Sequence, residues 1–195
     1  MDTKLYPQKI QKAFFEREET LKIAQETVGK FLFTSFDGHL TGGMITEVEA
    51  YLGAEDKACH SFGNRKTNRT KVMFESGGVA YVYLCYGMHH LFNIVTHQKE
   101  VPHAILIRSI KPHYGIEKML ERRGKTKLDK HLCSGPGNLS KALGMTTADT
   151  GKTVTGGEIY LEDHGISSLC IKQTPRIGID YAEEYRGKPW RFVAQ

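Results

Sequence analysis

Two neighbouring segments of alternating apolar side chains limit most strongly what this chain can fold into. VAYVYLCY at residues 79–86 and LFNIVTH at residues 91–97 have the pattern of β-strands, and a turn near Gly87 separates them. This spacing predicts an antiparallel hairpin. HAILIRSI at residues 103–110 follows at once and predicts a further strand. The middle of the chain is therefore expected to form a sheet.

The same patterns predict the other elements. Further strands are expected at residues 44–52, 158–163 and 167–174, with a break in the chain at Gly42 and Gly43 before the first of them. Helices are expected at residues 7–15, 18–28 and 114–127, and a capped turn with a short helix within residues 134–145. The last segment, residues 175–193, is expected to form a strand, a polar turn and a terminal strand.

These elements favour the α+β class. Strands follow one another without regular helices between them, and neither G-x-G-x-x-G nor G-x-x-x-x-G-K-[ST] occurs, which disfavours a doubly wound parallel sheet. With 195 residues, one domain is the natural size. We therefore predict a single domain, residues 1–195, with a curved, mostly antiparallel sheet, a protruding β-hairpin and surrounding helices.

Composition excludes several classes of protein. The chain has 39% hydrophobic and 25% charged residues, which is typical of a folded soluble protein. Its most apolar run is much shorter than the roughly 20 residues of a membrane span, and its first residues lack the apolar core of a signal peptide. Four widely spaced cysteines without a C-x-x-C pair favour reduced thiols. A cytoplasmic protein is expected.

No metal or cofactor is expected. The nine histidines include no H-x-x-x-H or H-E-x-x-H spacing, and no paired Cys/His spacing occurs. His89 and His90 are direct neighbours, so a strand would point them to opposite faces.

Basic residues gather in one part of the chain. The formal net charge is +5, and between residues 57 and 99 there is one acidic residue, Glu75, against six lysines and arginines. A solvated loop would explain this run. A surface that binds nucleic acid would also explain the run, because the aromatic segment at residues 79–86 could stack on bases while the basic residues contact phosphates.

The strand at residues 44–52 carries candidate chemistry. Alternation places Glu47, Glu49 and Tyr51 on one face. The two glutamates could simply face water, or a glutamate beside an aromatic pocket could act as a general base. A paired-carboxylate glycoside hydrolase is less favoured, since both carboxylates would lie side by side on one strand and not across a scissile bond.

The tyrosines of the hairpin are expected to divide between two roles. Tyr81 and Tyr83 share a face with Cys85 and could either stack on a flat ligand or belong to the core. Tyr86 precedes Gly87 at the expected tip, where a core role is less natural. An exposed aromatic residue beside a basic loop could wedge between DNA base steps.

Five ordered strings now suggest a family. They are TEVEAYLGAEDKACHS, GGVAYVYLCYGMHHLFNI, AILIRSIKP, LCSGPGNLSKALG and RIGIDYAEEYRGKPWRF. In this order they resemble the alkyladenine (3-methylpurine) DNA glycosylase family over roughly residues 20–195. The resemblance implies a monofunctional DNA glycosylase that flips a damaged purine out of double-stranded DNA and hydrolyses its bond to the sugar.

The resemblance also implies roles for individual residues. Glu49 matches the general base that activates water, Arg108 an arginine that positions this water, and Ile177 a residue whose backbone carbonyl contacts it. Tyr51, His60 and Tyr83 match the walls of the base pocket, and Asn93 matches the residue that rejects normal guanine. Tyr86 matches the side chain that fills the gap in the DNA, and the basic loop with Arg65, Arg69 and Lys71 matches one that contacts phosphates.

The implied substrates are alkylated purines such as 3-methyladenine and 7-methylguanine, with hypoxanthine and ethenoadenine as further candidates. The implied enzyme works as a monomer without a protein partner, at the nucleoid if the source is bacterial.

His89 and His90 depart from the family pattern, which has aromatic residues after Y-G-M. A non-catalytic RNA-recognition sheet with YVYLCY as its platform, and a small-molecule enzyme on a related fold, remain alternatives.

Overall fold

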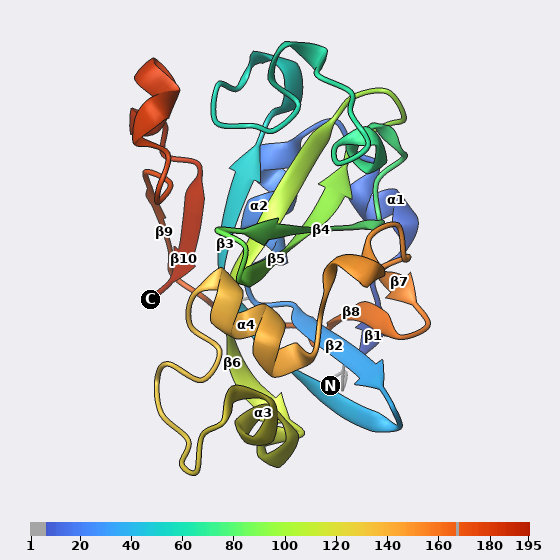
Figure 1. Cartoon of the computed structure of the whole chain (residues 1–195), viewed down its shortest axis with the longest axis vertical. Helices are drawn as coiled ribbons and strands as arrows, with labels where there is room; N and C mark the ends of the chain where they lie inside the picture. The colour runs from blue at the N-terminus through green and yellow to red at the C-terminus, as the bar shows by residue number, and fades with distance from the viewer. Residues whose placement is uncertain (1–6, 167) are drawn as a thin grey trace, which may run out of the picture.

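The computed structural model describes residues 7–166 and 168–195, and it has the predicted α+β architecture (Figure 1). Every strand pair in these residues is antiparallel, and the sheet has the order β1-β8-β2-β3-β6-β5-β4. The strands are β1 (Gln8–Lys9), β2 (Phe31–Phe36), β3 (His39–Tyr51), β4 (Ala80–Cys85), β5 (His89–Thr96), β6 (His103–Tyr114), β7 (Thr155–Gly156), β8 (Ile159–Asp163), β9 (Ile171–Thr174) and β10 (Arg191–Ala194). The α-helices are α1 (Lys12–Phe15), α2 (Thr20–Thr27), α3 (Ile116–Arg123) and α4 (Pro136–Leu143). Short 3-10 helices are η1 (Gly53–Glu55), η2 (Phe62–Asn64), η3 (Lys71–Phe74), η4 (Thr147–Asp149) and η5 (Asp180–Gly187).

Strand β3 is the longest strand and organises the sheet. Along one edge it pairs with β6, and along the other its first half pairs with β2. Its second half pairs with β10, which places Glu47 opposite Val193 and Glu49 opposite Arg191. The two glutamates therefore lie on a strand that is covered on both edges.

The predicted break at Gly42 and Gly43 is wrong, because both glycines lie inside β3. A Cβ atom on Gly43 would lie 2.1 Å from the carbonyl oxygen of Lys111, and one on Gly42 would lie 2.5 Å from the ring of Phe33. The glycines thus permit close approach of neighbouring strands within the sheet.

The two ends of the chain also differ from the prediction. Residues 7–15 do not form one helix, because Gln8 and Lys9 pair with Asp163 and Glu162 at the edge of β8, which leaves only the short α1. Near the C-terminus, the strand expected at the start of residues 175–193 is missing, and η5 and β10 follow. Of the strand expected at residues 167–174 only β9 forms, and Ser167 lies outside the described residues.

The sheet separates a large core from an aromatic pocket. Val82, Ile94 and Ile105, on neighbouring strands, pack into the main apolar cluster with helices α2 and α4. Residues with the opposite orientation on these strands, such as Tyr81 and Ala104, pack into a smaller cluster beside Tyr51 and Tyr83. The alternation of side chains along β4, β5 and β6 therefore gives one apolar face and one face for a site.

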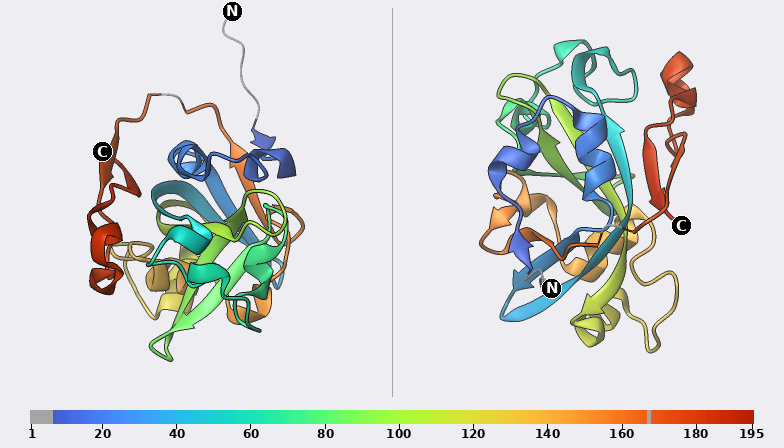
Figure 2. Two further views of the ribbon diagram at one scale, coloured as in Figure 1. Left: turned by 90° about the horizontal axis from the view of Figure 1, so that it is seen from above. Right: turned by 180° about the vertical axis from the view of Figure 1, so that it is seen from behind.

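The β4–β5 hairpin projects from the body of the protein (Figure 2). Its tip consists of Tyr86, Gly87 and Met88, and the side chains of Tyr86 and Met88 are 89% and 69% exposed. Tyr86 and Gly87 both have positive φ, of 51° and 70°. The protruding hairpin is confirmed.

Candidate active site

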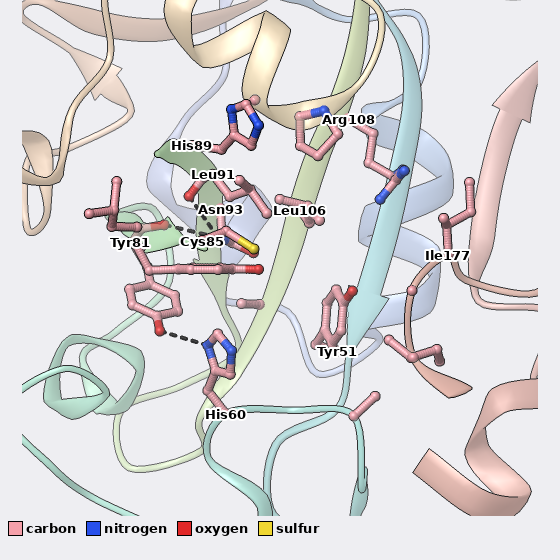
Figure 3. Close-up of a pocket in the computed structure, with 18 of the residues that line it drawn as sticks. Tyr51, His60, Tyr81, Cys85, His89, Leu91, Asn93, Leu106, Arg108 and Ile177 are labelled. Atoms are coloured by element: carbon pink, nitrogen blue, oxygen red, sulfur yellow. Dashed lines mark hydrogen bonds between the residues drawn. The ribbon is translucent and has the colours of Figure 1, made fainter. Parts of the chain in front are cut away.

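A cavity of about 580 Å³ opens on the aromatic side of the sheet (Figure 3). Its walls come from β3, β4, β5 and β6, the chain from the end of η1 to η3, the start of α4, and the segment that leads into η5. Of the predicted site residues, those that line it are Tyr51, His60, Arg69, Tyr83, Tyr86, Asn93, Arg108 and Ile177. Residues separated by more than a hundred positions in the sequence therefore meet at one hollow.

Glu49 lies beneath this cavity with its side chain fully buried. One carboxylate oxygen accepts hydrogen bonds from the hydroxyl of Tyr51, at 2.9 Å, and the other from the backbone N–H of Ile177, at 2.8 Å. The guanidinium of Arg108 lies 3.3 Å away. Burial outweighs these partners and raises the pKa of Glu49 above its usual value. Such a carboxylate is suited to accept a proton.

Glu47 has a different environment, although it is only two positions away. Its carboxylate accepts from the Nε atoms of Arg108, at 2.8 Å, and Arg191, at 2.7 Å. Burial alone would raise the pKa of Glu47, but the two guanidinium groups lower it below its usual value. Glu47 therefore stays ionised and holds Arg108, whereas the pKa of Glu49 is shifted in the direction that favours accepting a proton. Neither glutamate simply faces water.

Three aromatic side chains form one wall of the cavity. The His60 ring lies edge-on to Tyr83, with ring centroids 4.6 Å apart, and its Nδ1 lies 2.8 Å from the hydroxyl of Tyr81. Burial lowers the pKa of His60 to about 4, and it raises the pKa of Tyr81 to about 12. These rings are therefore uncharged at neutral pH and present flat, apolar faces.

The tautomer of His60 follows from its neighbours. The guanidinium of Arg69 lies 3.3 Å from Nε2 of His60 and can only donate a hydrogen bond. Nε2 is then the acceptor, so Nδ1 carries the proton and donates to Tyr81. Arg69 also lies over the ring of Tyr83, with its Cζ atom 4.9 Å from the ring centroid.

Asn93 forms part of the cavity floor on β5. Its side-chain nitrogen donates to the backbone carbonyl oxygens of Tyr81, at 3.1 Å, and Leu91, at 3.2 Å. Because both amide hydrogens are used, the orientation of the side chain is fixed. Leu106 lies opposite Asn93 on β6 and also lines the cavity.

The three basic residues predicted to contact phosphates are not equivalent in position. Arg65, Arg69 and Lys71 are all exposed. Arg69 turns toward the aromatic wall, Arg65 lines a smaller neighbouring hollow, and Lys71 lines neither. The structure brings the backbone N–H of Ile177 to Glu49, and the expected contact between the Ile177 carbonyl and the attacking water stays a prediction.

Sequence reasoning missed several members of this network. Arg191 and the buried pair of Arg176 and Asp56 were not singled out. Arg176 and Asp56 do fall inside two of the quoted strings, but nothing local in the sequence links residues 120 positions apart. For Glu47 the sequence suggested a side chain that faces water or half of a carboxylate pair, and neither interpretation includes its contact with Arg108.

The described residues contain no group of three or more His, Cys, Asp and Glu side chains that could hold a metal ion. Over the same residues, no helix combines the length and apolar character needed to cross a membrane.

Proteins of similar sequence show the family of this chain. The sequence profile of the methylpurine-DNA glycosylase (MPG) family matches residues 13–195. A protein from Chlamydia felis is 47% identical over 182 residues, which cover 93% of each chain. One from Bacillus cytotoxicus is 44% identical over 191 residues, or 93% of this chain and 94% of its own. Both carry the provisional name 3-methyladenine DNA glycosylase. The chain therefore belongs to the methylpurine-DNA glycosylase family and is a DNA glycosylase, an enzyme of DNA repair.

Proposed function

We propose that this enzyme flips alkylated purines, 3-methyladenine and 7-methylguanine among them, out of double-stranded DNA and removes them with a water molecule that Glu49 activates. The observation that carries the proposal is the fully buried Glu49 carboxylate, held by Tyr51, Ile177 and Arg108 beside an aromatic cavity. Hypoxanthine and ethenoadenine are further candidate substrates.

The chemistry suits a carboxylate acting without another catalyst. Alkylation of a ring nitrogen puts positive charge on the purine, so the base leaves as a neutral molecule with the electron pair of the glycosidic bond. Water forms the new bond to C1′ of the sugar and gives a proton to Glu49. Before it takes this proton, the negative charge of Glu49 would also stabilise oxocarbenium character at C1′. Arg108 would keep Glu49 ionised until that step.

The cavity walls support recognition of a flat, electron-poor ring. We assign stacking on the base to Tyr51 and Tyr83, with His60 at its edge, because uncharged tyrosine faces attract a cationic ring. The fixed amide of Asn93 would crowd the amino group of a normal guanine. These contacts can be made only after the nucleotide has left the base stack.

Tyr86 and the basic loop would engage the DNA around the flipped nucleotide. The tip tyrosine would fill the gap left by the flipped nucleotide, while Arg65, Arg69 and Lys71 would approach phosphates. We also propose that the enzyme acts as a monomer inside the cell, since all groups of the proposed site come from one chain. An RNA-recognition platform is less well supported, because Tyr81 and Tyr83 line a hollow with Glu49 beneath it.

The proposal predicts base release from DNA with defined lesions. Purified protein in EDTA should release free base from duplexes that contain one 7-methylguanine or 3-methyladenine, and none at appreciable rate from an undamaged duplex. Chromatography of the released bases measures this. A panel with hypoxanthine and ethenoadenine would define the substrate range. Absence of release from every alkylated duplex would contradict the proposed reaction and favour a binding module.

Replacing Tyr86 with serine should weaken binding to damaged DNA about tenfold, because stacking at a gap contributes about 1–3 kcal/mol per aromatic residue. Stability should change by less than about 0.5 kcal/mol, because the side chain is 89% exposed. Fluorescence anisotropy with an abasic duplex and thermal unfolding measure the two effects. Leu40→Ser, at an exposed position on the β2–β3 hairpin, is the control and should leave binding unchanged. A large drop in Tm for Tyr86→Ser would instead make Tyr86 a structural residue.

A further inference from the structure

Arg176 is buried beside Glu49 without touching it. Its side chain has no exposed surface, and its two terminal nitrogens bind the carboxylate of Asp56 at 2.5 and 2.9 Å. Its guanidinium lies between two aromatic rings, with Cζ 4.7 Å from the centroid of Tyr51 and 4.9 Å from that of Trp190. A bidentate, stacked arginine of this kind has a single available orientation.

This pair joins segments that are far apart in the sequence. The Nη1 atom of Arg176 also donates to the backbone carbonyl of Ala50, the residue between Glu49 and Tyr51. Asp56 accepts from the backbone N–H groups of Leu52 and Ala58, so it fixes the loop that leaves β3. The pair therefore ties the end of β3, the following loop and the segment before η5 together.

Both hydrogen-bond donors to Glu49 depend on these ties. Tyr51 donates through its hydroxyl, and its ring packs against the guanidinium of Arg176. Ile177 donates through its backbone N–H and directly follows Arg176 in the chain. A shift of the Arg176 guanidinium would thus disturb two of the contacts that hold the carboxylate.

From this arrangement we infer that Arg176, with Asp56, is a positioning residue for Glu49: it sets the place of the Tyr51 hydroxyl and of the Ile177 N–H, and through them the basicity and reactivity of the carboxylate. This inference rests on the proposed function. It assigns no contact with DNA to Arg176, whose side chain is fully covered.

The direction of the effect follows from the groups that face Glu49. These are Tyr51 and Glu47 from its own strand, Arg108 from β6, and the Ile177 N–H with Arg176 from the segment before η5. Burial raises the pKa of Glu49, while Arg108, the Ile177 N–H and the Tyr51 hydroxyl oppose the rise. Loss of the last two contacts should therefore raise the pKa of Glu49 further.

The first experiment compares Arg176→Lys and Asp56→Asn with wild type. Single-turnover excision of 7-methylguanine is measured between pH 5 and 9. We expect the midpoint of the acidic limb to move up by about one pH unit, and the rate below that midpoint to fall about tenfold. Affinity for an abasic duplex should change less than about twofold, because the DNA-facing groups are retained.

A matched control separates positioning from stability. Arg122 donates to Thr41 and to the carbonyl oxygen of Ala142, and so bridges elements that lie away from Glu49. Arg122→Lys should lower Tm without moving the pH midpoint. If Arg176→Lys and Asp56→Asn lower Tm and leave the midpoint at the wild-type value, the positioning role is wrong. If Arg176→Lys does not fold, Asp56→Asn alone decides.

Two further measurements do not depend on how much the variants lose stability. In the Tyr51→Phe background, Arg176→Lys should shift the pH midpoint less than it does in wild type, since one of the two routes to Glu49 is already lost; equal shifts would contradict the inference. Carbon-13 NMR of the glutamate carboxyl groups follows the titration of Glu49 without any substrate. If wild type releases no base, the proposed function fails. An upward shift of the Glu49 titration in Arg176→Lys or Asp56→Asn, relative to wild type, would still support the positioning role. A titration unchanged from wild type would overturn it.

Discussion

Glu49→Gln should lower single-turnover excision of 7-methylguanine about a thousandfold at neutral pH, because a positioned general base contributes roughly 10²–10⁴ to a rate. Glutamine can still accept the hydrogen bond from the Ile177 N–H through its amide oxygen, so the cavity should keep its shape. It cannot take a proton from water. The loss should therefore persist at every pH at which the protein is folded. Quenched-flow or manual time courses on a duplex with one lesion measure it.

The stability of this variant provides an independent check with a defined sign. Burial raises the pKa of Glu49, so the folded protein binds this proton more tightly than the unfolded chain does. The resulting stabilisation is complete below the unfolded pKa and is lost as pH rises through the higher folded pKa. At neutral pH the buried charge of the ionised carboxylate thus lowers stability. A glutamine at this position carries no charge and avoids this loss. The Tm of Glu49→Gln at pH 7.5 should equal or exceed that of wild type.

Glu55→Gln is the matched control for this charge removal. Glu55 is exposed in η1, shortly after β3, and lies outside the cavity lining. Its replacement should leave the excision rate unchanged. If Glu49→Gln retains more than about a tenth of the wild-type rate, Glu49 is not the general base, because loss of a general base costs at least about a hundredfold.

Local sequence patterns predicted the strands of the site well. Alternation in residues 44–52 and 79–86 correctly placed Glu49 with Tyr51 and Tyr81 with Tyr83, because side chains of a strand keep to two faces whatever the strand packs against. The hairpin tip at Tyr86 followed from the same spacing. Local patterns failed at Gly42 and Gly43, where close strand contacts and not a turn require glycine. They also failed at Gln8 and Lys9, which the distant β8 draws into the sheet edge.

The contacts that tune the site depend on long-range topology. Arg191 reaches Glu47 only because β10 adds to the half of β3 that β2 leaves open. The pairing of β10 with β3 also brings the segment before η5 past the end of β3, and only there can Arg176 meet Asp56. No period or motif in a single sequence specifies which free strand edge a later strand will join. The catalytic candidates could thus be recognised, while the groups that hold them could not.

Arg108→Met should lower the excision rate at neutral pH about a hundredfold, because an arginine beside a carboxylate shifts its pKa by about 1–3 units. Burial raises the pKa of Glu49, and Arg108 is the strongest opposing group. Without it the pKa rises further, so a smaller fraction of Glu49 is ionised at pH 7. If the ionised form of Glu49 is the base, as proposed, activity should recover in part as pH increases. A pH–rate profile measured up to pH 9.5 would show this, and it contrasts with Glu49→Gln, which no pH should restore.

Arg191→Met tests whether this effect comes from Glu49 and not from loss of stability. Both arginines bind Glu47 in partly buried ion pairs, so each variant removes a partner of this carboxylate and should lower Tm. Only Arg108 also lies at Glu49, at 3.3 Å. Arg191→Met should therefore keep the acidic limb of the pH–rate profile near the wild-type midpoint, whereas Arg108→Met should move it upward. If both variants moved it equally, Glu47 would be coupled to the reaction as strongly as Glu49, and the division of roles between the two carboxylates would be wrong.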